Sequence, residues 1–325
     1  MCAHLPETFE PLLKKIHARL LASVPPELPV SLRDPIHYFL NLPSKKIRPL
    51  MTLFACQVCG GTTEDALPAA TAVELFHDFT LIHDDIMDQD ELRRGFQTLH
   101  VKYDDGTAIL VGDALIGLAY QQLMDSPANV LDRVVQMFTE ALIKVCEGQA
   151  LDRDFESTEE VSVDAYLDMI GKKTAWLFQT ACSLGAMCAN AGADQVGALQ
   201  KFGYSIGLGF QIQDDLLDFV ADEQRLGKKI GSDFRMHKKT YVTLKYREMV
   251  QQSPELKKEF PRRAGDFPSF SDFQAALNRL NIVAKAREEA EQFIEQGLNA
   301  LAEITPPGEE NPLFRLTRFL QNRQY

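Results

Sequence analysis

The sequence has too few basic residues to balance its acidic ones. Its 34 Lys and Arg residues are outnumbered by 46 Asp and Glu residues, and the formal net charge is −12 at pH 7. A chain this acidic is repelled by nucleic acid and by anionic membrane surfaces. We therefore expect no nucleic-acid partner, and any anionic ligand has to be held locally by a few Lys and Arg residues or by bound metal.

Targeting signals and membrane-spanning runs are also lacking. The first residues show no basic region followed by an apolar run, so we expect no signal peptide. The longest uncharged stretch, residues 174–193, contains Thr, Gln, Ser and Asn among many Ala and Gly residues. A buried helix explains this composition better than a membrane span does. The sequence predicts no transmembrane segment and a cytoplasmic location.

The six cysteines form no paired framework. Cys56 and Cys59 make a lone C-x-x-C motif with no second pair or histidine cluster nearby. Reduced thiols in the core are therefore favoured over a zinc site or redox chemistry, in agreement with a cytosolic compartment. The sequence also offers no obvious Ser-His or Cys-His arrangement for nucleophilic catalysis.

Strand signals are scarce, and almost every long segment has helical period. Apolar residues recur at helical spacing in residues 10–24, 107–124, 131–151, 164–170, 174–190, 194–220, 273–301 and 313–322. A polar, proline-marked stretch at 253–272 is read as a connection. No linker, low-complexity tract or repeat divides the chain, so we expect one all-α domain over residues 1–325.

Two matching acidic motifs carry the chemistry. Each reads D-D-x-x-D after an apolar helical stretch, one with Asp84, Asp85 and Asp88 and the other with Asp214, Asp215 and Asp218. Carboxylates at positions i and i+4 share a helix face and repel each other unless a cation lies between them. An all-oxygen donor set favours Mg²⁺ or Mn²⁺, and Mg²⁺ shares its coordination shell with substrate phosphates. One such motif is common on a solvated helix, but two indicate a diphosphate site.

Basic residues accompany both triads. Arg93 and Arg94 follow the first triad, Lys228 and Lys238 follow the second, and Lys173 lies between them. Lys45 and Arg48 stand nearer the N-terminus. In an acidic chain these cations suit phosphate oxygens, with Arg as the bidentate partner and Lys as a point charge.

With these motifs the chain, from Lys45 to Arg323, resembles the trans-isoprenyl diphosphate synthases. The resemblance implies an orthogonal α-helical bundle around a deep central cavity, usually a homodimer. It implies head-to-tail condensation of isopentenyl diphosphate with an allylic prenyl diphosphate. It also implies three Mg²⁺ ions held on the allylic diphosphate by the carboxylates of Asp84, Asp85, Asp88, Asp214 and Asp218.

The resemblance assigns roles to further residues. It places Arg93, Lys173, Lys228 and Lys238 on the allylic diphosphate, and Lys45, Arg48, His77 and Arg94 on isopentenyl diphosphate. It places Thr174 and Gln211 near the reacting carbons, and Gly148-Gln149 with Asp152 matches another family motif. The chain departs from the family at Pro43-Ser44, where Gly-Gly is common, and at His237, where Gly is usual.

In this family, bulk upstream of the first triad limits product length. Thr80, Phe79 and Phe76 lie roughly 6, 7.5 and 12 Å below Asp84 along a helix. Thr80 is small enough to let a prenyl tail pass, whereas Phe79 and Phe76 form a floor, unless they are ordinary core residues. We expect a C15–C20 product, with geranylgeranyl diphosphate ahead of farnesyl diphosphate.

Other functions remain open at this point. A class I terpene cyclase shares the fold but usually has an Asn/Ser/Glu metal motif in place of the second triad. Squalene- or phytoene-type synthases use acidic motifs of different spacing, and a non-catalytic regulatory subunit would have damaged triads. His77-Asp78 and His83-Asp84 echo the HD phosphohydrolases, but that interpretation leaves the second triad unexplained. For His83, a structural hydrogen bond and a supporting role at the metal site remain equal alternatives.

Overall fold

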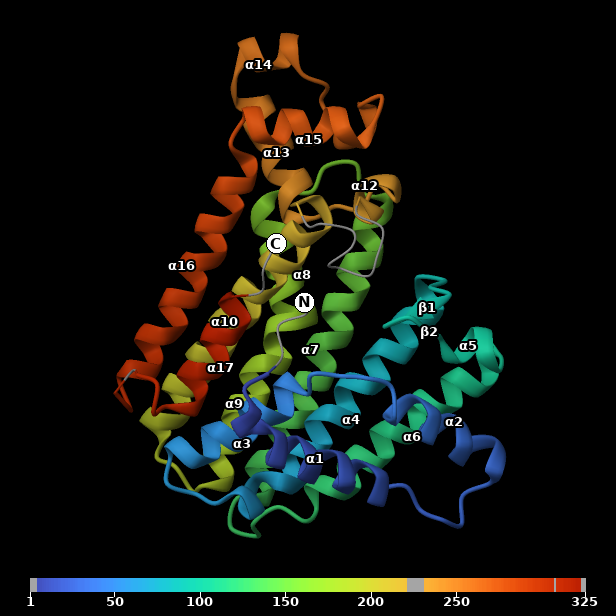
Figure 1. Ribbon diagram of the computed structural model, residues 1–325, viewed down its shortest axis with the longest axis vertical. Helices are drawn as coiled ribbons and strands as arrows, with labels where there is room; N and C mark the ends of the chain where they lie inside the picture. The colour runs from blue at the N-terminus through green and yellow to red at the C-terminus, as the bar shows by residue number, and fades with distance from the viewer. Residues whose placement is uncertain (1–4, 221–230, 307, 323–325) are drawn as a thin grey trace.

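The computed structural model describes residues 5–220, 231–306 and 308–322, most of them in helices (Figure 1). The first half of the chain contains η1 (Glu7–Phe9), α1 (Glu10–Ala22), α2 (Val30–Leu40), α3 (Ile47–Val58), α4 (Thr63–Met87), β1 (Leu92–Arg93), β2 (Phe96–Gln97), α5 (Leu99–Lys102), α6 (Asp105–Leu123) and α7 (Leu131–Ser157). The second half contains α8 (Val163–Ile170), η2 (Gly171–Ala175), α9 (Trp176–Cys188), α10 (Ala193–Val220), α12 (Ser232–Arg235), α13 (Tyr241–Gln252), α14 (Pro254–Glu259), η3 (Ala264–Asp266), α15 (Phe270–Arg279), α16 (Ile282–Ala302) and α17 (Pro312–Gln321).

The all-α prediction is confirmed, with two local corrections. The stretch 273–301 is not one helix, because Asn281 has a left-handed backbone (φ 54°) and separates α15 from α16. The supposed connection at 253–272 contains α14 and η3. The described residues also contain a two-stranded hairpin that the sequence did not predict. Its turn residues, Arg94 and Gly95, both have positive φ, as a tight type I′ turn requires.

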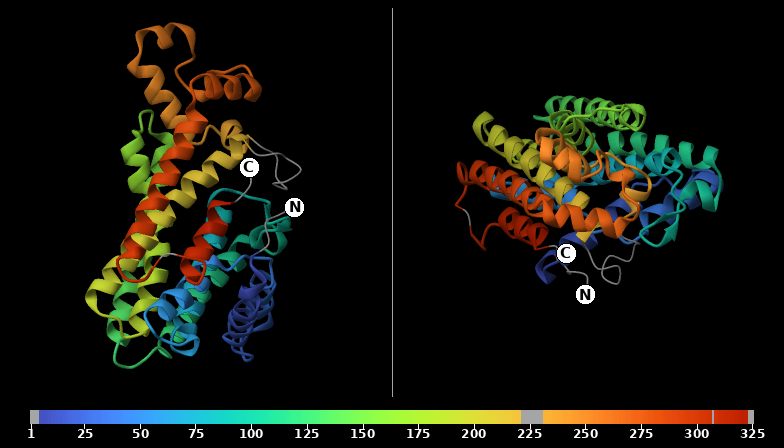
Figure 2. Two further views of the ribbon diagram at one scale, coloured as in Figure 1. Left: turned by 60° about the vertical axis from the view of Figure 1, so that its left-hand side comes forward. Right: turned by 90° about the horizontal axis from the view of Figure 1, so that it is seen from above.

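The long helices run along the longest axis of the molecule, as Figures 1 and 2 show for α7, α10 and α16. Helices α13, α14 and α15 cover one end, while α1 to α6 fill the other. Each end has its own hydrophobic cluster, and both α10 and α16 contribute to the two clusters. The two carboxylate triads lie at the C-terminal ends of α4 and α10.

Helix α9, which covers most of the uncharged stretch, lies in the core as predicted. Leu177, Phe178, Ala181 and Leu184 are almost completely buried. Among the described residues, no helix is long and apolar enough to cross a membrane.

Candidate active site

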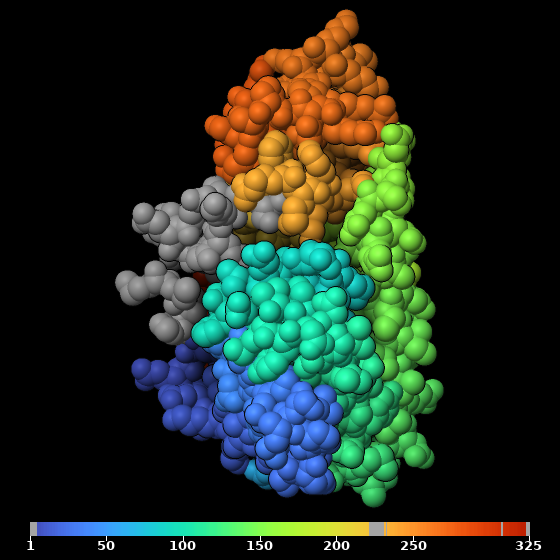
Figure 3. Space-filling model, turned by 90° about the vertical axis from the view of Figure 1, so that its right-hand side faces the viewer, coloured from blue at the N-terminus to red at the C-terminus, as the bar shows by residue number. Residues whose placement is uncertain are grey.

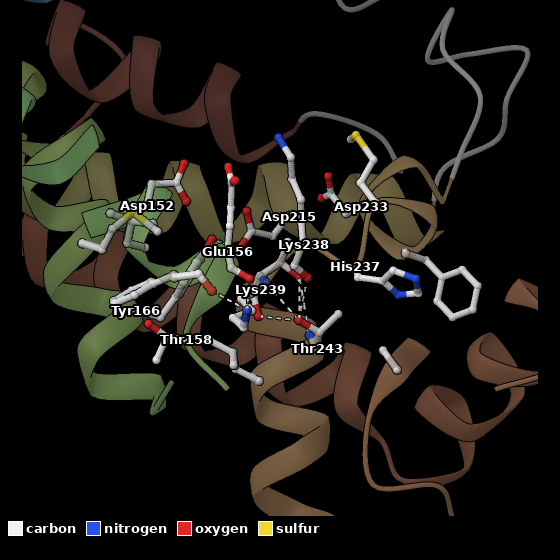
Figure 4. A pocket seen from close by; sticks show the side chains of 18 of the residues that line it. Asp152, Glu156, Thr158, Tyr166, Asp215, Asp233, His237, Lys238, Lys239 and Thr243 are labelled. Atoms are coloured by element: carbon white, nitrogen blue, oxygen red, sulfur yellow. Dashed lines mark hydrogen bonds between the residues drawn. The ribbon is translucent and has the colours of Figure 1, made fainter. Parts of the chain in front are cut away.

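Residues of both triads line one cavity of about 990 Å³. Its lining includes Asp88 from the first triad and Asp214 and Asp215 from the second. Lys173 and Lys238 lie in the same wall (Figure 4 labels Lys238 and Asp215). Asp88 and Asp214, 126 positions apart in the chain, thus share one space, as the two matching motifs suggest.

Each carboxylate of the first triad faces a cation from a different element. Arg93 of β1 contacts Asp85 Oδ1 through Nε at 2.6 Å and Nη2 at 2.5 Å. Lys173 Nζ lies 3.9 Å from Asp84 Oδ2. Lys238, from the segment before α13, reaches Asp88 Oδ2 at 3.3 Å. Three of the four cations that the resemblance assigns to the allylic diphosphate therefore pair with the predicted metal ligands.

Lys173 is presented by η2, a π-helical turn of the kind often found at functional sites. This turn packs directly on α7, where a Cβ at Gly148 would lie 2.2 Å from the Lys173 backbone nitrogen. From η2, Lys173 also donates to Asp152 Oδ2 of α7 at 2.7 Å. The Gly148-Gln149 and Asp152 motif thus has a structural reason: it lets η2 approach α7 and anchors the lysine.

Burial shapes the electrostatics of the first triad. It raises the pKa of Asp84 to about 6, although the nearby Lys173 acts in the opposite direction. It also raises the pKa of Asp85 against the hydrogen bond from Arg93. Buried carboxylates of this kind need positive charge close by in order to stay ionised.

The donor set fits Mg²⁺. The triads offer carboxylate oxygens alone, the ligands that this small, hard cation prefers. Within residues 5–220, 231–306 and 308–322 no three His, Cys, Asp or Glu side chains already converge as a metal site.

The three aspartates of the second triad differ in their surroundings. Asp214 is exposed in the cavity wall. Asp218 Oδ2 accepts a hydrogen bond from the backbone N–H of Asp233 at 2.9 Å. Asp215 is almost fully buried and accepts three hydrogen bonds. These bonds lower the pKa of its carboxyl group, but burial outweighs them and raises the pKa to about 7. The resemblance did not count Asp215 among the metal ligands, but the sequence did not predict the three hydrogen-bond donors that surround it.

Thr174 and Gln211, predicted to lie near the reacting carbons, are in direct contact. Thr174 Oγ1 donates to Gln211 Oε1 at 3.0 Å, and both residues line the cavity. Thr174 comes from η2 and Gln211 from α10, one turn before Asp215.

A second basic group lies beside the hairpin. Arg48 Nη1 donates to His77 Nε2 at 3.1 Å, and its guanidinium lies 4.5 Å from the Phe178 ring centre. Burial and the neighbouring Arg48 and Arg94 push the His77 pKa well below its usual value, so the imidazole is neutral and accepts from Arg48. Lys45 Nζ lies 5.4 Å from the Phe319 ring centre of α17. The hairpin connects this basic group with the first triad: Arg93 contacts Asp85, and the charge of Arg94 lowers the pKa of His77.

A buried charge cluster behind this group was missed from the sequence. Lys46 follows Lys45 with a left-handed backbone (φ 49°), and its Nζ lies 2.9 Å from Glu74 Oε1 and 4.0 Å from Asp78 Oδ2. All three charged side chains are almost fully buried. The cluster anchors the turn that carries Lys45 and Arg48. One hint of this cluster was present in the sequence: Lys46 follows Lys45 directly, and the resemblance assigns it no role.

The proposed floor residues belong to a buried aromatic cluster. The rings of Phe76 and Phe79 stack with centres 5.2 Å apart, and Phe138 of α7 lies 5.1 Å from Phe76. Thr80 donates to the His77 carbonyl and is only partly buried.

His83 packs edge-on against Phe79 and close to α6. A Cβ at Gly112 would lie 2.2 Å from His83 Nε2. Its Nε2 also lies 3.4 Å from the Ile109 carbonyl oxygen, which favours a structural role for this histidine.

Two predicted features lie at or beyond the edge of the described chain. Lys228 lies outside the described residues. His237, which replaces the usual Gly, has a positive φ of 53°, a conformation that Gly adopts more readily. Lys238 and Lys239 then point to opposite sides (Figure 4), and Lys239 donates to carbonyls at the end of α7.

Comparison with known proteins gives consistent matches. A sequence model of the family described as polyprenyl synthetase matches residues 29–276. A geranylgeranyl diphosphate synthase of Sulfolobus acidocaldarius is 38% identical over 75% of both chains. A geranylfarnesyl diphosphate synthase of Natronomonas pharaonis is 35% identical over 93% of both. The crystal structure of a geranylgeranyl pyrophosphate synthetase from Pyrococcus horikoshii Ot3 superposes with a TM-score of 0.88, at 30% identity, over 98% of each chain.

The buried cluster predicts a pH-dependent stability. Burial raises the pKa of Asp78 to about 7, above its value in the unfolded chain. The folded state therefore binds this proton more tightly, and stability from Asp78 is lost as pH rises from about 4 through 7. Asp78→Asn has no such loss, so from pH 5 to pH 8 its free energy of unfolding should gain on the wild type by roughly 2 kcal/mol.

Urea unfolding at the two pH values measures this difference. Asp132→Asn, which changes an exposed carboxylate on α7, serves as the control and should show no such gain. An Asp78→Asn difference that is equal at pH 5 and pH 8 would contradict the assignment.

Proposed function

The chain belongs to the polyprenyl synthetase family, and from this premise we propose that it is a prenyltransferase that makes a short-chain prenyl diphosphate. It condenses isopentenyl diphosphate with an allylic prenyl diphosphate in a Mg²⁺-dependent, head-to-tail reaction. The observation that carries this proposal is that residues of both carboxylate triads line one cavity, with a Lys or Arg against each carboxylate of the first.

The ion pairs of the first triad support an exchange on substrate binding, in which the carboxylates pass from the Lys and Arg side chains to the metal ions. Asp84, Asp85 and Asp88, with Asp214 and Asp218, would hold the ions, three per site in our proposal, with Mn²⁺ as a substitute. Arg93, Lys173 and Lys238 are then released from the carboxylates to bind the diphosphate oxygens. Bound Mg²⁺ supplies charge neutralisation for the departing diphosphate.

The reaction needs no nucleophilic side chain. The allylic C–O bond breaks, and its electron pair leaves with the diphosphate. The double bond of isopentenyl diphosphate supplies the electrons of the new C–C bond, and a proton is then lost to the released diphosphate. Thr174 and Gln211 place oxygen atoms beside the reacting carbons, where they stabilise positive charge.

The second basic group fits isopentenyl diphosphate. Lys45, Arg48 and Arg94 supply positive charge, while neutral His77 orients Arg48. The Lys46 cluster fixes the turn before α3, so that Lys45 and Arg48 are positioned before the substrate arrives.

We propose geranylgeranyl diphosphate as the main product, with farnesyl diphosphate second. Relatives named geranylgeranyl and geranylfarnesyl diphosphate synthases support a product of about this length. The stacked Phe76 and Phe79 support a floor beneath the first triad.

We also propose a cytoplasmic homodimer built from single-domain chains. Exposed apolar side chains on α6 and α7 support the dimer: Ile109, Leu110 and Ile143 are 45%, 62% and 56% exposed. Figure 3 shows α6 (teal) and α7 (green) on one face of the molecule. The free thiols of Cys56, Cys59, Cys146, Cys182 and Cys188 support a reducing compartment. The sharing of α10 and α16 between the two hydrophobic clusters supports one domain.

Product analysis tests the function. Purified protein with Mg²⁺, isopentenyl diphosphate and each of dimethylallyl, geranyl and farnesyl diphosphate should give prenyl diphosphates that stop at one length. Asp84→Asn should lower turnover at least about a hundredfold, whereas Asp132→Asn should not. A hydrocarbon or alcohol with isopentenyl diphosphate untouched would indicate a cyclase, and no turnover at all would indicate a regulatory subunit.

Replacement of the floor residue tests product length. Phe79→Ala should shift the product to longer chains, because the space below the first triad deepens. Phe273→Ala, a similar truncation in the other hydrophobic cluster, should lower stability by about 3–5 kcal/mol without changing product length. Chromatography of the dephosphorylated products, made at a temperature where both variants are folded, measures the shift. An unchanged profile for Phe79→Ala would remove the basis for the floor.

A further inference from the structure

The Asp215 carboxylate is the meeting point of three elements. Its Oδ2 accepts from the Tyr166 hydroxyl of α8 at 2.6 Å and from the Tyr241 backbone N–H of α13 at 2.9 Å. Its Oδ1 accepts from Gln211 Nε2 of α10 at 3.0 Å. Both Asp215 and Tyr166 are almost completely buried, at 4% and 3% exposure. Neither residue has a role in the proposed metal or substrate contacts.

The hydrogen bonds of Asp215 determine which way round the Gln211 amide lies. A carboxylate only accepts hydrogen bonds, so the amide group facing Oδ1 has to be the NH₂ of Gln211. The amide oxygen then points the other way, where it accepts from the Thr174 hydroxyl at 3.0 Å. Because the Thr174 hydroxyl hydrogen is engaged by Gln211, both oxygen atoms present only lone pairs to the cavity.

We infer that Tyr166 and Asp215 are positioning residues that hold the Gln211 amide with its oxygen, and not its NH₂, toward the reacting carbons. The inference rests on the proposed function. An oxygen dipole stabilises an allylic cation, whereas a reversed amide places positive N–H hydrogens against the same charge. The hydroxyl of Tyr166 acts at a distance: it occupies Oδ2 together with Tyr241 N–H and so keeps Oδ1 turned toward Gln211.

The same carboxylate also holds the start of α13, close to the segment that carries Lys238. Tyr241 N–H binds Asp215, and Lys238, three residues earlier, contacts Asp88 of the first triad. Figure 4 shows Tyr166, Asp215 and Lys238 around the cavity. Asp215 thus connects the first residues of α13 with α8 and α10, so its loss affects the Lys238 segment as well. Tyr166→Phe removes only one of the two donors to Oδ2 and leaves the carboxylate and its bond to the Tyr241 N–H in place, so it is the cleaner test.

Tyr166→Phe removes one hydroxyl and keeps the ring. At pH 8 we expect kcat for condensation to fall about tenfold, with KM for both diphosphates within twofold of the wild type. The second readout is binding in the presence of Mg²⁺, without turnover, of two allylic diphosphate analogues. One carries an ammonium nitrogen at the cationic carbon, and the other is an uncharged thiolodiphosphate. The preference for the charged analogue should fall about tenfold, and affinity for the neutral analogue should stay constant.

Tyr246→Phe is the matched control. Tyr246 is another fully buried tyrosine of the same hydrophobic cluster, and its hydroxyl donates to the Pro261 carbonyl at 2.7 Å, away from the cavity. Its loss should lower the melting temperature by a similar amount but leave kcat and the analogue preference unchanged. Asp215→Asn, which retains shape but lets the Gln211 amide reverse, should lose the preference more fully and covers the case that Tyr166→Phe does not fold.

The outcomes separate the inference from the proposed function. If the wild type makes no prenyl diphosphate, the proposed function fails. If the wild type is active but Tyr166→Phe and Asp215→Asn keep its preference for the charged analogue, the positioning role is wrong and both residues are structural. If Tyr246→Phe loses the preference equally, the effect arises from general loosening of the cluster, and the inference is likewise overturned.

Discussion

Mutual repulsion among carboxylates is the constraint on which this site depends. The first triad occupies the last turn of α4, where the helix dipole already places negative charge, and the carboxylates of Asp84 and Asp85 are largely withdrawn from water. Such a turn is stable only beside cations. Arg93, Lys173 and Lys238 supply them from a hairpin, a π-helical turn and the segment before α13. Neutralising the triad therefore brings distant parts of the chain to one cavity.

This arrangement gives the protein a poised resting state. The cations needed for the diphosphate are already at the cavity, held by the carboxylates that would hold the metal ions. Substrate and metal ions together satisfy both sets of charges, whereas either alone leaves one set without a partner. The second basic group follows the same principle, because Lys46 lies between Glu74 and Asp78 and fixes the turn that presents Lys45 and Arg48.

The sequence predicted what depends on local pattern. Helical periodicity located the long helices, and the repeated D-D-x-x-D motif located both triads. It did not predict the π-helical turn at Gly171–Ala175 or the break at Asn281, since both depend on tertiary packing and backbone conformation. Nor did it distinguish Asp215 from Asp214 and Asp218: identical residues in one motif differ only through burial and through partners such as Tyr166, which comes from another helix.

If the two triads act as one Mg²⁺-dependent diphosphate site, the binding of a diphosphate should require Mg²⁺ and both triads. Calorimetric titration of an unreactive allylic thiolodiphosphate should show tight binding only with Mg²⁺. Asp84→Asn and Asp214→Asn should each weaken it at least about tenfold, although the two residues belong to different helices. Equal affinity with and without Mg²⁺, or wild-type affinity in Asp214→Asn, would contradict the account.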